Sequence, residues 1–509
     1  MVKKRPVDKR IIGKGRPAPS LSVFKALNEI ARLRDDAVVE GVGALAKGLG
    51  MEVWLVGGVV RNIALGMERP PDYDFAVSGD PNAIAIASAR RLGGSCFVLD
   101  KDAPSYRVAF KKGGAASGVS LDFSPLKGKG VLDDLKARDF TVDAMAVDVS
   151  ALFAGEDAGV LDPCGGVEDA KARVLRAASP GVFDEDPLRM LRAVRLSRQY
   201  GLEITADTSS LIRAKAGLIG RSSVERVRDE LLAIFSNEGA SVGIRMLYET
   251  GLMRVIIPEM GDWDAPTGYD VLSHTLKTLD EAEALLDAVT EASFGGYHLQ
   301  IKRRMDASAG AVSGKAFFKL AAFFHDVGKP SVMTSEDGRL RFRGHDHVGS
   351  LMTKEILRRL RFSRTTAGDV AKLVGNHHRV FGLVDLARPT ARAKAHLLRS
   401  AGPGLGIDLL LLALADARAT RGGEDEALLN AVRGMIAFHY EVYTRKRPKP
   451  VLTGTEIMKT FRIPEGPLVG EAMAWIAEGV ESGAVKTKKD AVAFVRERLM
   501  ERQKERQGR

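Results

Sequence analysis

The sequence predicts an α+β protein in which a small mixed-sheet domain is followed by an extended, nearly all-α region. Short apolar runs that suit buried strands alternate with helical spacing up to about Arg176, and after Pro187 helical periodicity dominates. At roughly 100 to 200 residues per domain, a chain of 509 residues is too long for one compact core. We therefore expect about three or four domains.

The mixed-sheet region begins after Met51 with a strand, a turn and a helix. VWLVGG predicts a short buried strand that ends at Gly57 and Gly58, and VVRNIALG predicts the helix that follows. DYDFAV and GVSLDFSP predict two more strands, and AIAIASARRLGG between them has the apolar spacing of a helix. Together these elements predict a small sheet with helices packed on it.

Helical periodicity continues in LRMLRAVRLSRQYGL, SVERVRDELLAIF and GIRMLYETGLMRVI. The Ala, Ser and Gly content near Gly295 and over residues 307–314 predicts a loop or an insertion.

Composition indicates a folded cytoplasmic protein that does not span a membrane. Apolar residues make up 45% and charged residues 28%, so each domain can bury a core. Two cysteines, Cys96 and Cys164, indicate a reducing compartment without a disulfide framework. The apolar run around Leu409 to Ala415 is shorter than a membrane helix and is closed by Asp416.

The charge balance favours a polyanionic partner. Lys plus Arg number 76 and Asp plus Glu 65, which leaves a formal net charge of +11. Residues 1–20 are basic and no apolar signal core follows them, so we expect a flexible basic arm. An excess of this size favours nucleic acid through counterion release and steering.

Asp72 and Asp74 in DYDFAV are two residues apart on a predicted strand, so both project from one face. Two such carboxylates can hold two Mg²⁺ ions, which would activate an attacking 3′-hydroxyl and neutralise a triphosphate. An isolated Asp-x-Asp is more often a solvated turn. Here it follows Gly57-Gly58, whose backbone N–H groups can approach phosphates, and Arg61 one turn into the helix.

Asp122 is the third carboxylate candidate for this metal site. It lies mid-strand in VSLDFSP between Leu121 and Phe123, where a carboxylate needs a partner or a metal ion.

Five stretches follow one another in the chain: LVGGVVRN, DYDFAV, KARDFTVDAMAVD, DPCGGVEDA and EDPLRMLRAVR. They resemble the successive motifs of class II CCA-adding enzymes and bacterial poly(A) polymerases, as does the C-terminal text LTGTEIM and PEGPLVGEAM. The resemblance covers most of the chain and implies a polymerase-β-like head with helical neck, body and tail. It also implies Mg²⁺ as cofactor and the tRNA 3′ end, ATP and CTP as partners.

The resemblance implies roles for single residues. Gly58 and Arg61 would hold the triphosphate, and Asp72 with Asp74 the metal ions. Arg138 and Asp139 would contact the ribose and phosphate side of the nucleotide.

In EDPLRMLRAVR, Asp186 and Arg189 match the pair that selects the nucleotide in this family. Three residues apart on one predicted helix, an acceptor and a donor can form one edge that reads the Watson–Crick face of ATP or CTP. Arg192 and Arg195 extend the basic row. Without the surrounding motifs, a surface ion pair with solvated arginines is the simpler interpretation.

Three positions depart from the family's pattern. Asn62 stands where the family usually has Asp, Ala137 where it often has a second Arg, and Asp143 where Asn is usual. Asp72 and Asp74 are unaffected, so the departures bear on nucleotide preference more than on metal binding.

A second metal site is indicated by FFHDVGKP, which places His325 and Asp326 at the end of an apolar helix. The order His, His-Asp and a distant Asp resembles the HD phosphohydrolase superfamily. The resemblance implies four ligands and two further histidines that could support a second metal ion: His274, His325, Asp326 and Asp416, then His345 and His377. Mixed imidazole and carboxylate ligands suit Mn, Ni, Fe or Co with a bound water as nucleophile. Such a region can also persist as an inactive scaffold.

These patterns predict a flexible arm at 1–20, a nucleotidyltransferase head at 21–176 and a helical neck at 177–262 that selects nucleotides and binds RNA. An HD-like metal domain at 263–440 and a helical tail at 441–509 follow. The main interpretation is a CCA-adding tRNA nucleotidyltransferase with an HD domain. A poly(A) polymerase, or an enzyme adding only CC or only A, shares this chemistry. An HD phosphodiesterase with an inactive head is the alternative from another class, against which the intact Asp72, Asp74, Asp186 and Arg189 argue.

Overall fold

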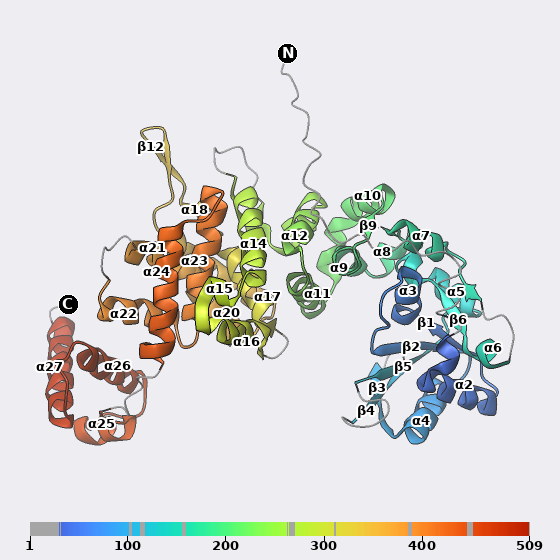
Figure 1. Ribbon diagram of the computed structural model, residues 1–509, viewed down its shortest axis with the longest axis horizontal. Helices are drawn as coiled ribbons and strands as arrows, with labels where there is room; N and C mark the ends of the chain where they lie inside the picture. The colour runs from blue at the N-terminus through green and yellow to red at the C-terminus, as the bar shows by residue number, and fades with distance from the viewer. Residues whose placement is uncertain are drawn as a thin grey trace, which may run out of the picture. The chain divides into compact units, whose positions relative to one another are not determined.

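The computed structural model describes residues 30, 32–100, 104–111, 118–154, 159–261, 263, 270–309, 312–384, 389–444 and 451–507. The chain forms two compact units (Figure 1). The first comprises Met1–Ser223 and Met246–Ile256, and the second comprises Val224–Arg245 and Ile257–Arg509. The predicted basic arm at residues 1–20 lies outside the described residues.

The first unit is built on a mixed sheet, which confirms the predicted α+β class. Its described strands are seven, in the order β3-β4-β5-β2-β1-β6-β7. Strands β2 and β5 are parallel, and the other neighbours are antiparallel. The strands are β1 (Val53–Val56), β2 (Asp72–Val77), β3 (Gly94–Asp100), β4 (Ser105–Phe110), β5 (Ser120–Pro125), β6 (Ala146–Asp148) and β7 (Val160–Leu161).

One face of this sheet is covered by helices. Helix α4 packs on β3, β4 and β5, and α2 packs on α4 and α6. On this face Phe75 of β2 stacks on Phe123 of β5, with ring centroids 5.1 Å apart. Tyr73 of β2 donates a hydrogen bond of 2.7 Å to Asp36, the residue that caps α2. The helices of the unit are α2 (Ala37–Leu49), α3 (Gly58–Leu65), α4 (Pro81–Leu92), α5 (Val131–Lys136), α6 (Val149–Ala154), α7 (Gly166–Ala172), α8 (Val182–Glu185), α9 (Arg189–Tyr200), α10 (Ala206–Lys215) and α13 (Leu252–Ile256), with the 3₁₀ turns η1 (Arg32–Asp35), η2 (Thr141–Asp143) and η3 (Ala216–Arg221).

The opposite face carries the carboxylates. Side chains alternate along a strand, so Asp72, Asp74 and Ala76 share a face. Ala76 belongs to a small core with Leu135 of α5, which places α5 on this side of the sheet. The two aspartates therefore project from the face that the large helices leave uncovered.

The predicted strands β1, β2 and β5 and the predicted helix α4 are confirmed. The sequence does not predict the edge strand β3 and its neighbour β4, because both bury few apolar side chains. Phe97 of β3 is 46% exposed, and only one residue of β4 is fully buried.

The second unit is mostly helical, as predicted. An aromatic core surrounds Phe323 of α17, whose ring contacts those of Phe235, Trp263 and Phe324 at centroid distances of 5.5, 5.8 and 4.8 Å. The helices are α11 (Val224–Ser236), α14 (Val271–Asp287), α15 (Glu291–Phe294), α16 (His298–Asp306), α17 (Gly314–Phe324), α18 (Lys329–Val332), α19 (His345–Arg359), α20 (Arg364–Asn376), α21 (Arg379–Val384), α22 (Ala391–Ala401), α23 (Gly406–Arg421) and α24 (Glu426–Phe438), with η4 (Pro258–Met260), η5 (Gly295–Tyr297) and the π-helix η6 (His439–Tyr443). Helix α12 (Ala240–Glu249) spans the division between the units.

The C-terminal helices have a core of their own. Helices α25 (Gly454–Phe461), α26 (Pro467–Glu481) and α27 (Lys488–Gln507) bury a cluster that includes Ile457, Ala472 and Val495. A capping box between Thr453 and Glu456 starts α25.

Short strand pairs interrupt the predicted helical region. Strands β8 (Val174–Leu175) and β9 (Glu203–Ile204) are parallel. Strands β10 (Ser308–Ala309) and β11 (Val312–Ser313) replace part of the loop predicted at 307–314, of which residues 310 and 311 lie outside the described residues. The loop predicted near Gly295 is instead the short helix η5. Strands β12 (Thr334–Glu336) and β13 (Arg339–Arg341) form a hairpin.

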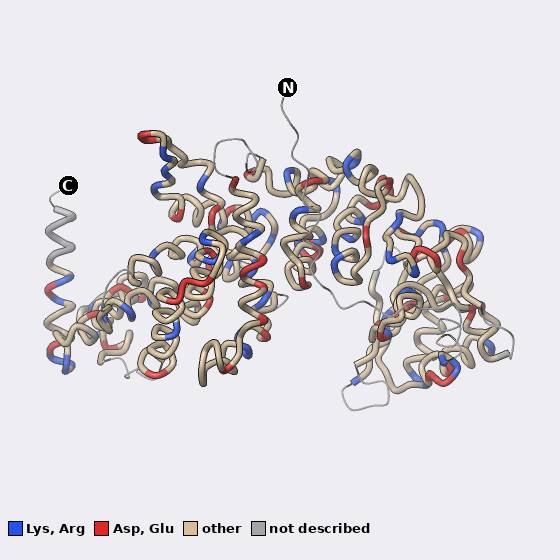
Figure 2. Tube along the Cα trace, turned by 45° about the horizontal axis from the view of Figure 1, so that its top comes forward, with Lys and Arg blue, Asp and Glu red and all other residues tan. Residues whose placement is uncertain are grey.

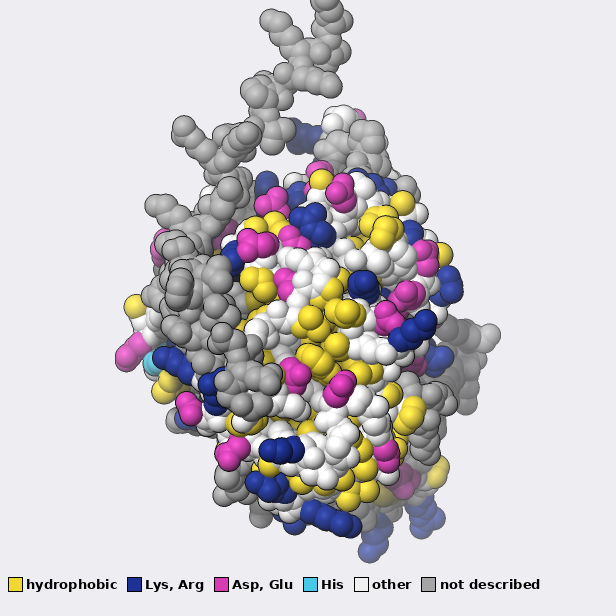
Figure 3. Space-filling model, turned by 90° about the vertical axis from the view of Figure 1, so that its right-hand side faces the viewer, with side chains coloured by type: hydrophobic (Ala, Val, Ile, Leu, Met, Phe, Trp, Pro, Cys, Tyr) yellow, Lys and Arg dark blue, Asp and Glu magenta, His cyan; other side chains and the backbone are white. Residues whose placement is uncertain are grey.

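Within the described residues, no single helix is long and apolar enough to cross a membrane. Helices α22 and α23 meet the length and composition criteria only together, and they are bent by 93°. Most of α23 is buried inside the protein. On the described part of the face drawn in Figure 3, side chains of both charges are interspersed with hydrophobic ones, so the basic excess does not form one patch there.

Candidate active site and metal centre

The turn between β1 and α3 brings the backbone close to the carboxylates. Gly57 has φ of 68°, a conformation that side chains rarely adopt, and a Cβ there would lie 2.9 Å from Asp74 Oδ2. Gly58 is the first residue of α3. The glycine pair thus forms the predicted strand-to-helix turn and lets the start of α3 lie directly beside Asp74.

Three carboxylates share one face of the sheet. Asp74 of β2 pairs in register with Asp122 of β5, and Asp72 pairs with Ser120, whose hydroxyl donates to it. Asp72 is exposed and Asp74 is half-buried, while Tyr73 between them is buried. The structure therefore brings together the three side chains that the sequence predicts as metal ligands.

The electrostatics of Asp74 suit a cation. Burial raises its pKa from 3.8 to about 6, Arg138 opposes that rise, and Asp122, Asp143 and Asp72 add to it. A nearby positive charge favours the ionised form of such a buried carboxylate.

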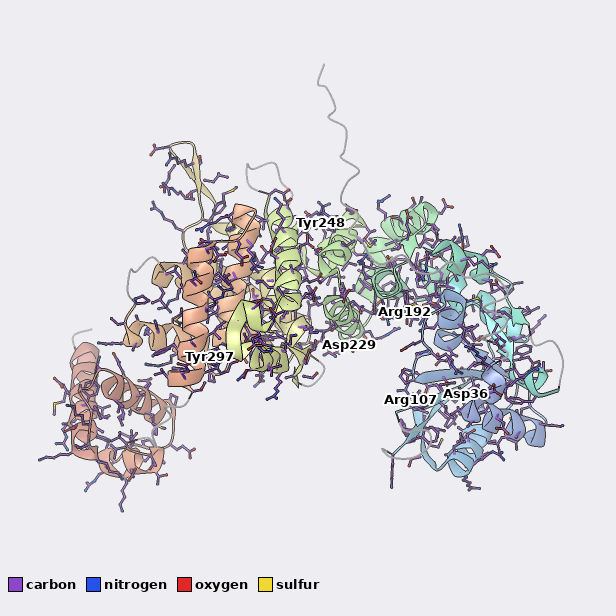
Figure 4. The ribbon with its side chains drawn as sticks, viewed as in Figure 1. Asp36, Arg107, Arg192, Asp229, Tyr248 and Tyr297 are labelled. Carbon is purple, nitrogen blue, oxygen red and sulfur yellow. The ribbon has the colours of Figure 1, made fainter. Side chains whose placement is uncertain are left out.

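Asp122 already has a cationic partner. Arg107 of β4 lies opposite it in register and donates Nε to Oδ1 at 2.7 Å and Nη2 to Oδ2 at 2.6 Å (Figure 4). This two-pronged contact uses both carboxylate oxygens. Asp122 is thus held beside Asp74, and a cation at this position has to share Asp122 with Arg107.

Three consecutive residues after α5 connect the sheet to α9. The carbonyl of Ala137 accepts from Arg189 Nη2 at 3.1 Å. Arg138 donates to Asp134 at 3.0 Å and faces Asp74. Asp139 lies 2.8 Å from Arg192 Nε (Figure 4). We call residues 137–139 the connecting segment. It joins the carboxylate face to the arginines of α9.

The predicted nucleotide-selecting pair has a different local structure from the one expected. Asp186 is not on a helix with Arg189: it is extended, with φ −142° and ψ 100°, and α9 begins at Arg189. Pro187 explains the difference, because a residue before proline is disfavoured in the helical region. The Asp186 carboxylate accepts from Leu188 N at 3.1 Å.

The arginines of α9 follow the predicted three-residue steps. Arg189 is anchored by Glu185 at 3.1 Å and by the carbonyl of Val182 at 3.2 Å, in addition to Ala137. Arg195 contacts Gln199 at 3.1 Å.

Arg61 lies in a buried network. Its Nη1 donates to Asp143 Oδ1 at 2.6 Å, its Nη2 donates to Tyr200 at 2.5 Å, and both Nε and Nη2 contact Asn62 Oδ1 at 3.3 Å. The guanidinium also lies over the Tyr200 ring, 4.1 Å from its centroid. These contacts tie α3 to α9 and η2, so Arg61 positions the start of α3 in this structure.

The second site lies in the second unit, where the predicted histidines and aspartates meet. His274 of α14 places Nε2 3.1 Å from His325 Nε2, 3.3 Å from Asp326 Oδ2 and 3.2 Å from Asp416 Oδ1. Asp416 comes from α23, and His325 and Asp326 follow α17. All four predicted HD ligands therefore converge.

Asp326 joins this group to a second one. Its Oδ1 lies 3.4 Å from His345 Nε2 and 3.8 Å from His377 Nε2, while Lys329 Nζ lies 2.5 Å from Oδ2. His345, His377 and His378 offer nitrogen atoms within 4.8 Å of one another.

Backbone carbonyls orient three of these imidazoles in the same way. The Nδ1 atoms of His325, His345 and His377 contact the carbonyls of Ala322, Phe342 and Val374, three residues earlier, at 2.7, 2.8 and 2.6 Å. If Nδ1 carries the proton, Nε2 presents a lone pair to the centre of the site. His345 Nε2 and His377 Nε2 are buried and make no hydrogen bond within the part of the chain that the structure describes.

Burial and charge set the protonation of the cluster. Burial lowers the pKa of His377 to about 3, and the neighbouring His325 contributes to that shift. Burial opposes the charge on Asp326, but His325 and Lys329 outweigh it and hold the pKa of that carboxyl well below its usual range. A neutral imidazole and an ionised carboxylate are the forms that bind cations.

The turn between His325 and α19 is tightly packed. A Cβ on Gly328 would lie 2.3 Å from the carbonyl of His345 and 2.5 Å from Gly349 N. Only glycine lets this turn approach the start of α19, and that approach brings Asp326 to His345.

Known protein families match the regions of the chain that contain these two groups of residues. Residues 53–176 match the family described as "Poly A polymerase head domain", and residues 271–420 match the "HD domain". Residues 201–263 match "Probable RNA and SrmB- binding site of polymerase A".

Curated relatives cover nearly the whole chain. The chain is 34% identical over 455 residues to an A-adding tRNA nucleotidyltransferase of Deinococcus radiodurans, covering 87% of this chain and 94% of that protein. It is 32% identical to a CC-adding tRNA nucleotidyltransferase of Thermus thermophilus, with 86% and 92% covered. The chain belongs to the tRNA nucleotidyltransferase and poly(A) polymerase family.

Solved structures of this family share the fold. A CCA-adding enzyme in complex with ATP matches with a TM-score of 0.61 at 20% identity, covering 94% of this chain and 99% of that one. A Thermotoga maritima CCA-adding enzyme complexed with tRNA matches with a TM-score of 0.55 at 20% identity and the same coverage. Nucleotidyltransferases of this family are metal-dependent, and a divalent cation suits the carboxylate face.

Two departures from the family's pattern meet at one side chain. Asn62 stands where the family usually has Asp, Asp143 stands where Asn is usual, and both contact Arg61. In this chain Asp143 supplies the carboxylate beside Arg61 and Asn62 supplies an amide oxygen. The third departure, Ala137, contributes its backbone carbonyl to Arg189.

Some residues of these sites are missed by sequence reasoning. Arg107 and Tyr200 lie far along the chain from the groups they contact. The alternation in SYRVAF places Arg107 on the strand face opposite that of Tyr106 and Val108, but it does not identify Asp122 as its partner. His378 is visible in the sequence beside His377, and the structure groups it with His345.

Because Asn62 and Asp143 both contact Arg61, we predict that mutations at these two positions have non-additive effects on stability. Asp143→Asn leaves a buried guanidinium without a carboxylate, and the loss is expected to be about 3–5 kcal/mol. Asn62→Asp alone buries a second carboxylate and is also destabilising. The double variant restores one carboxylate and should recover most of the thermal unfolding midpoint, although it loses the hydrogen bond of 2.7 Å from Asn62 Nδ2 to the Glu68 carbonyl.

Thermal unfolding of wild type, both single variants and the double variant measures this coupling. Asp133→Asn, which changes an exposed aspartate of the same unit, is the control. Additive losses in the double variant would contradict the compensation.

A second prediction concerns pH. Because Asp74 has a pKa of about 6, a divalent cation competes with a proton there below that pH. The metal concentration that half-saturates nucleotide addition should rise about tenfold per unit as the pH falls below 6, and should level off above it. In the metal-free protein, the raised pKa means that ionisation of Asp74 lowers stability as the pH rises from 3.8 to about 6.

Arg138→Gln tests the assignment of this titration. Arg138 lowers the pKa of Asp74, so its neutralisation should move the inflection to higher pH, whereas Arg138→Lys should move it less. If the inflection occurs at the same pH in both variants as in wild type, the titrating group is not Asp74.

Proposed function

We propose that this protein adds CMP and AMP to the 3′ end of tRNA without a nucleic acid template, and so completes the CCA sequence. The observation that carries the proposal is the carboxylate face of β2 and β5, joined by the connecting segment to the arginines of α9. The names of the relatives support tRNA as the acceptor, and the solved neighbours with ATP and CTP support those nucleotides as donors.

Asp72 and Asp74, with Asp122 beside them, would hold Mg²⁺, which makes the acceptor hydroxyl more acidic and neutralises the triphosphate. In the transfer, the 3′-hydroxyl oxygen bonds to the α-phosphorus of the nucleotide, and the bond from that phosphorus to pyrophosphate breaks. The hydroxyl proton leaves to solvent. The chain's own contribution is to hold the reacting groups in line.

Other residues of the first unit would position the nucleotide. The backbone N–H groups at Gly57 and Gly58 lie at the start of α3, where a helix binds phosphate. Arg138 and Asp139 would contact the phosphate and ribose. We infer that Arg61 positions the glycine turn through its contacts with Asp143 and Tyr200, and that with Gly58 it holds the triphosphate side of the nucleotide.

Nucleotide choice is assigned to Asp186 and Arg189. Asp186 accepts and Arg189 donates, so together they would read the edge of cytosine or adenine. The contact of Arg189 with the Ala137 carbonyl fixes its guanidinium relative to the connecting segment. Arg192 and Arg195 would extend the basic row toward the phosphates of the nucleotide or the RNA.

A second candidate is addition of only one kind of nucleotide. The chain covers 94% of the A-adding relative and 92% of the Thermus CC-adding relative, and it is at least 32% identical to both. A CC-adding relative from Geobacter sulfurreducens is 30% identical. These names favour an A-only or CC-only enzyme as the alternative to complete CCA addition.

We further propose that the histidine cluster is a phosphohydrolase site. His274, His325, Asp326 and Asp416 would bind Mn²⁺ or Ni²⁺, and His345 and His377, with His378, would support a second ion. Such an ion supplies an activated water. Hydrolysis would join the water oxygen to the phosphorus and break the ester bond. The proton of the water would pass to solvent, and the ammonium of Lys329 is a nearby proton source for the leaving oxygen.

The proposed parts of the chain are a head at 21–176, a neck at 177–262, an HD domain at 263–440 and a tail at 441–509. The separate core of helices α25 to α27 supports a distinct tail. The free cysteines Cys96 and Cys164 agree with a cytoplasmic location.

The activity is tested with a tRNA that lacks its 3′-terminal CCA. Wild type given CTP and ATP should extend it by C, C and A, read at single-nucleotide resolution. Asp72→Asn and Asp74→Asn should lower the rate by more than about 100-fold with little change in tRNA binding, because they hold metal and not the acceptor.

Glu52→Gln, at an exposed carboxylate before β1, is the matched control and should retain full activity. Extension by A alone after a supplied CC end, or by CC alone, would select the second candidate. A long A tail would indicate a poly(A) polymerase, and full activity of the Asp74 variant would refute the assigned metal site.

The two metal sites should be separable. His325→Ala with Asp326→Ala should remove bound Mn or Ni and any phosphodiesterase activity, while Mg²⁺-dependent nucleotide addition continues. Metal content and both activities are measured beside wild type.

Because His325 and Asp326 are fully buried, Asp416→Asn serves as a gentler variant at the same site. If wild type carries no transition metal and hydrolyses no phosphate ester, the HD region is a scaffold. If the folded variants lose nucleotide addition, the sites are coupled.

A further inference from the structure

The hairpin of β12 and β13 extends from the helical part of the second unit (Figure 1). Its strands pair Thr334 with Arg341 and Glu336 with Arg339. Asp337 and Gly338 form the turn with φ of 51° and 72°, the two positive values that a tight hairpin turn requires. The nucleotidyl transfer proposed for the first unit does not use this hairpin.

One face of the hairpin carries a row of arginines. Arg339 and Arg341 of β13 are two residues apart and share a face of the strand. Arg343 follows β13 in a turn, and it lies on the same side as Arg341 because both contact the Glu336 carboxylate. The three arginines are exposed, and Figure 2 shows basic residues along the hairpin with acidic ones at its tip. We call these three residues the arginine row.

The base of the hairpin borders a pocket of about 460 Å³ next to the histidine cluster. Arg341 and Arg343 line it from the hairpin, and His345 and His378 line it from the cluster. Lys329, which pairs with Asp326, lines it as well. The pocket therefore connects the arginine row to the groups proposed to bind metal.

His345, proposed above as a ligand of a second metal ion, also lines this pocket. His345 is 7% exposed, and its Nε2 has no hydrogen-bond partner among the described residues. The ring is held from the hairpin side, because its Nδ1 contacts the carbonyl of Phe342 at 2.8 Å. The same short segment thus carries the arginine row and orients a proposed metal ligand.

We propose that the arginine row binds the phosphodiester backbone of a single-stranded RNA end, whose terminal phosphate enters the pocket beside His345. This proposal rests on the phosphohydrolase activity proposed above, and it gives RNA ends that carry a terminal phosphate as the substrate class. Guanidinium groups bind phosphate in a planar, two-pronged geometry. At about 3.3 Å per residue, the strand part of the row from Arg339 to Arg341 spans about 7 Å, and Arg343 extends it, so the row is longer than one phosphate group. A substrate with several phosphates in series matches that length.

Glu336 limits this surface in the absence of RNA. Its Oε2 lies 3.1 Å from Arg343 Nη2 and 3.9 Å from Arg341 Nε. A phosphate that binds these arginines has to compete with that carboxylate. Glu336→Gln should therefore strengthen RNA binding, in the opposite direction to loss of the arginines.

The test compares two substrates with the same terminal phosphate: a short 3′-phosphorylated oligoribonucleotide and a nucleoside 3′-monophosphate. In the full chain, replacement of Arg339, Arg341 and Arg343 by Gln should raise KM for the oligoribonucleotide at least tenfold. It should leave kcat for the oligoribonucleotide near wild type and raise KM for the mononucleotide much less, because only Arg341 and Arg343 line the pocket that the terminal phosphate enters. Glu336→Gln should lower KM for the oligoribonucleotide, and Arg358→Gln on α19 is the exposed control.

Binding of the fluorescent oligoribonucleotide is measured in parallel, so that the hairpin is tested even if hydrolysis is absent. The triple variant should bind more weakly, and the slope of log affinity against log salt should fall by about 2, for three lost contacts to a single strand. A wild type that binds through the row but hydrolyses neither substrate would refute the phosphohydrolase and keep the binding surface. Unchanged binding by the triple variant, or equal losses for both substrates, would overturn the proposal.

Discussion

The first unit depends on three consecutive residues that make contacts in three directions. Ala137 offers its carbonyl to Arg189, Arg138 faces Asp74 while it pairs with Asp134, and Asp139 pairs with Arg192. Because they are adjacent in the chain, the distance between the carboxylate face and α9 is set by the backbone itself. A metal site and a base-reading edge on separate elements need such a short link to keep their spacing.

The carboxylate face could be predicted from local pattern alone, because a period of two places Asp72 and Asp74 together whatever the tertiary structure. The pairing of Asp122 with Arg107 could not, since it depends on which strand neighbours β5. The helix expected through Asp186 overlooks the restriction that Pro187 imposes on the residue before it. Pro187 is visible in the sequence, but the helical prediction gave more weight to the periodic spacing of the apolar residues.

The histidine cluster likewise combines features that the sequence predicts with features that only the folded structure reveals. The order His274, His325-Asp326 and Asp416 indicates the ligand set, but it does not reveal that the two oxygens of Asp326 face different histidine groups. That geometry arises because Gly328 allows the turn after α17 to pack against the start of α19. The carbonyl three residues before each of three histidines then fixes the ring, a repeated device that only the folded backbone displays.

The placement of one carboxylate, from Asp143, and one amide, from Asn62, around Arg61 limits which single substitutions the chain tolerates. Going from one arrangement to the other by single substitutions passes through a protein with either two carboxylates or none beside a buried guanidinium. Both single variants are expected to be less stable, so substitutions at the two positions are expected to occur together. Positions 62 and 143 are 81 residues apart in the chain, yet both contact one guanidinium, so the residue that suits one position depends on the residue at the other.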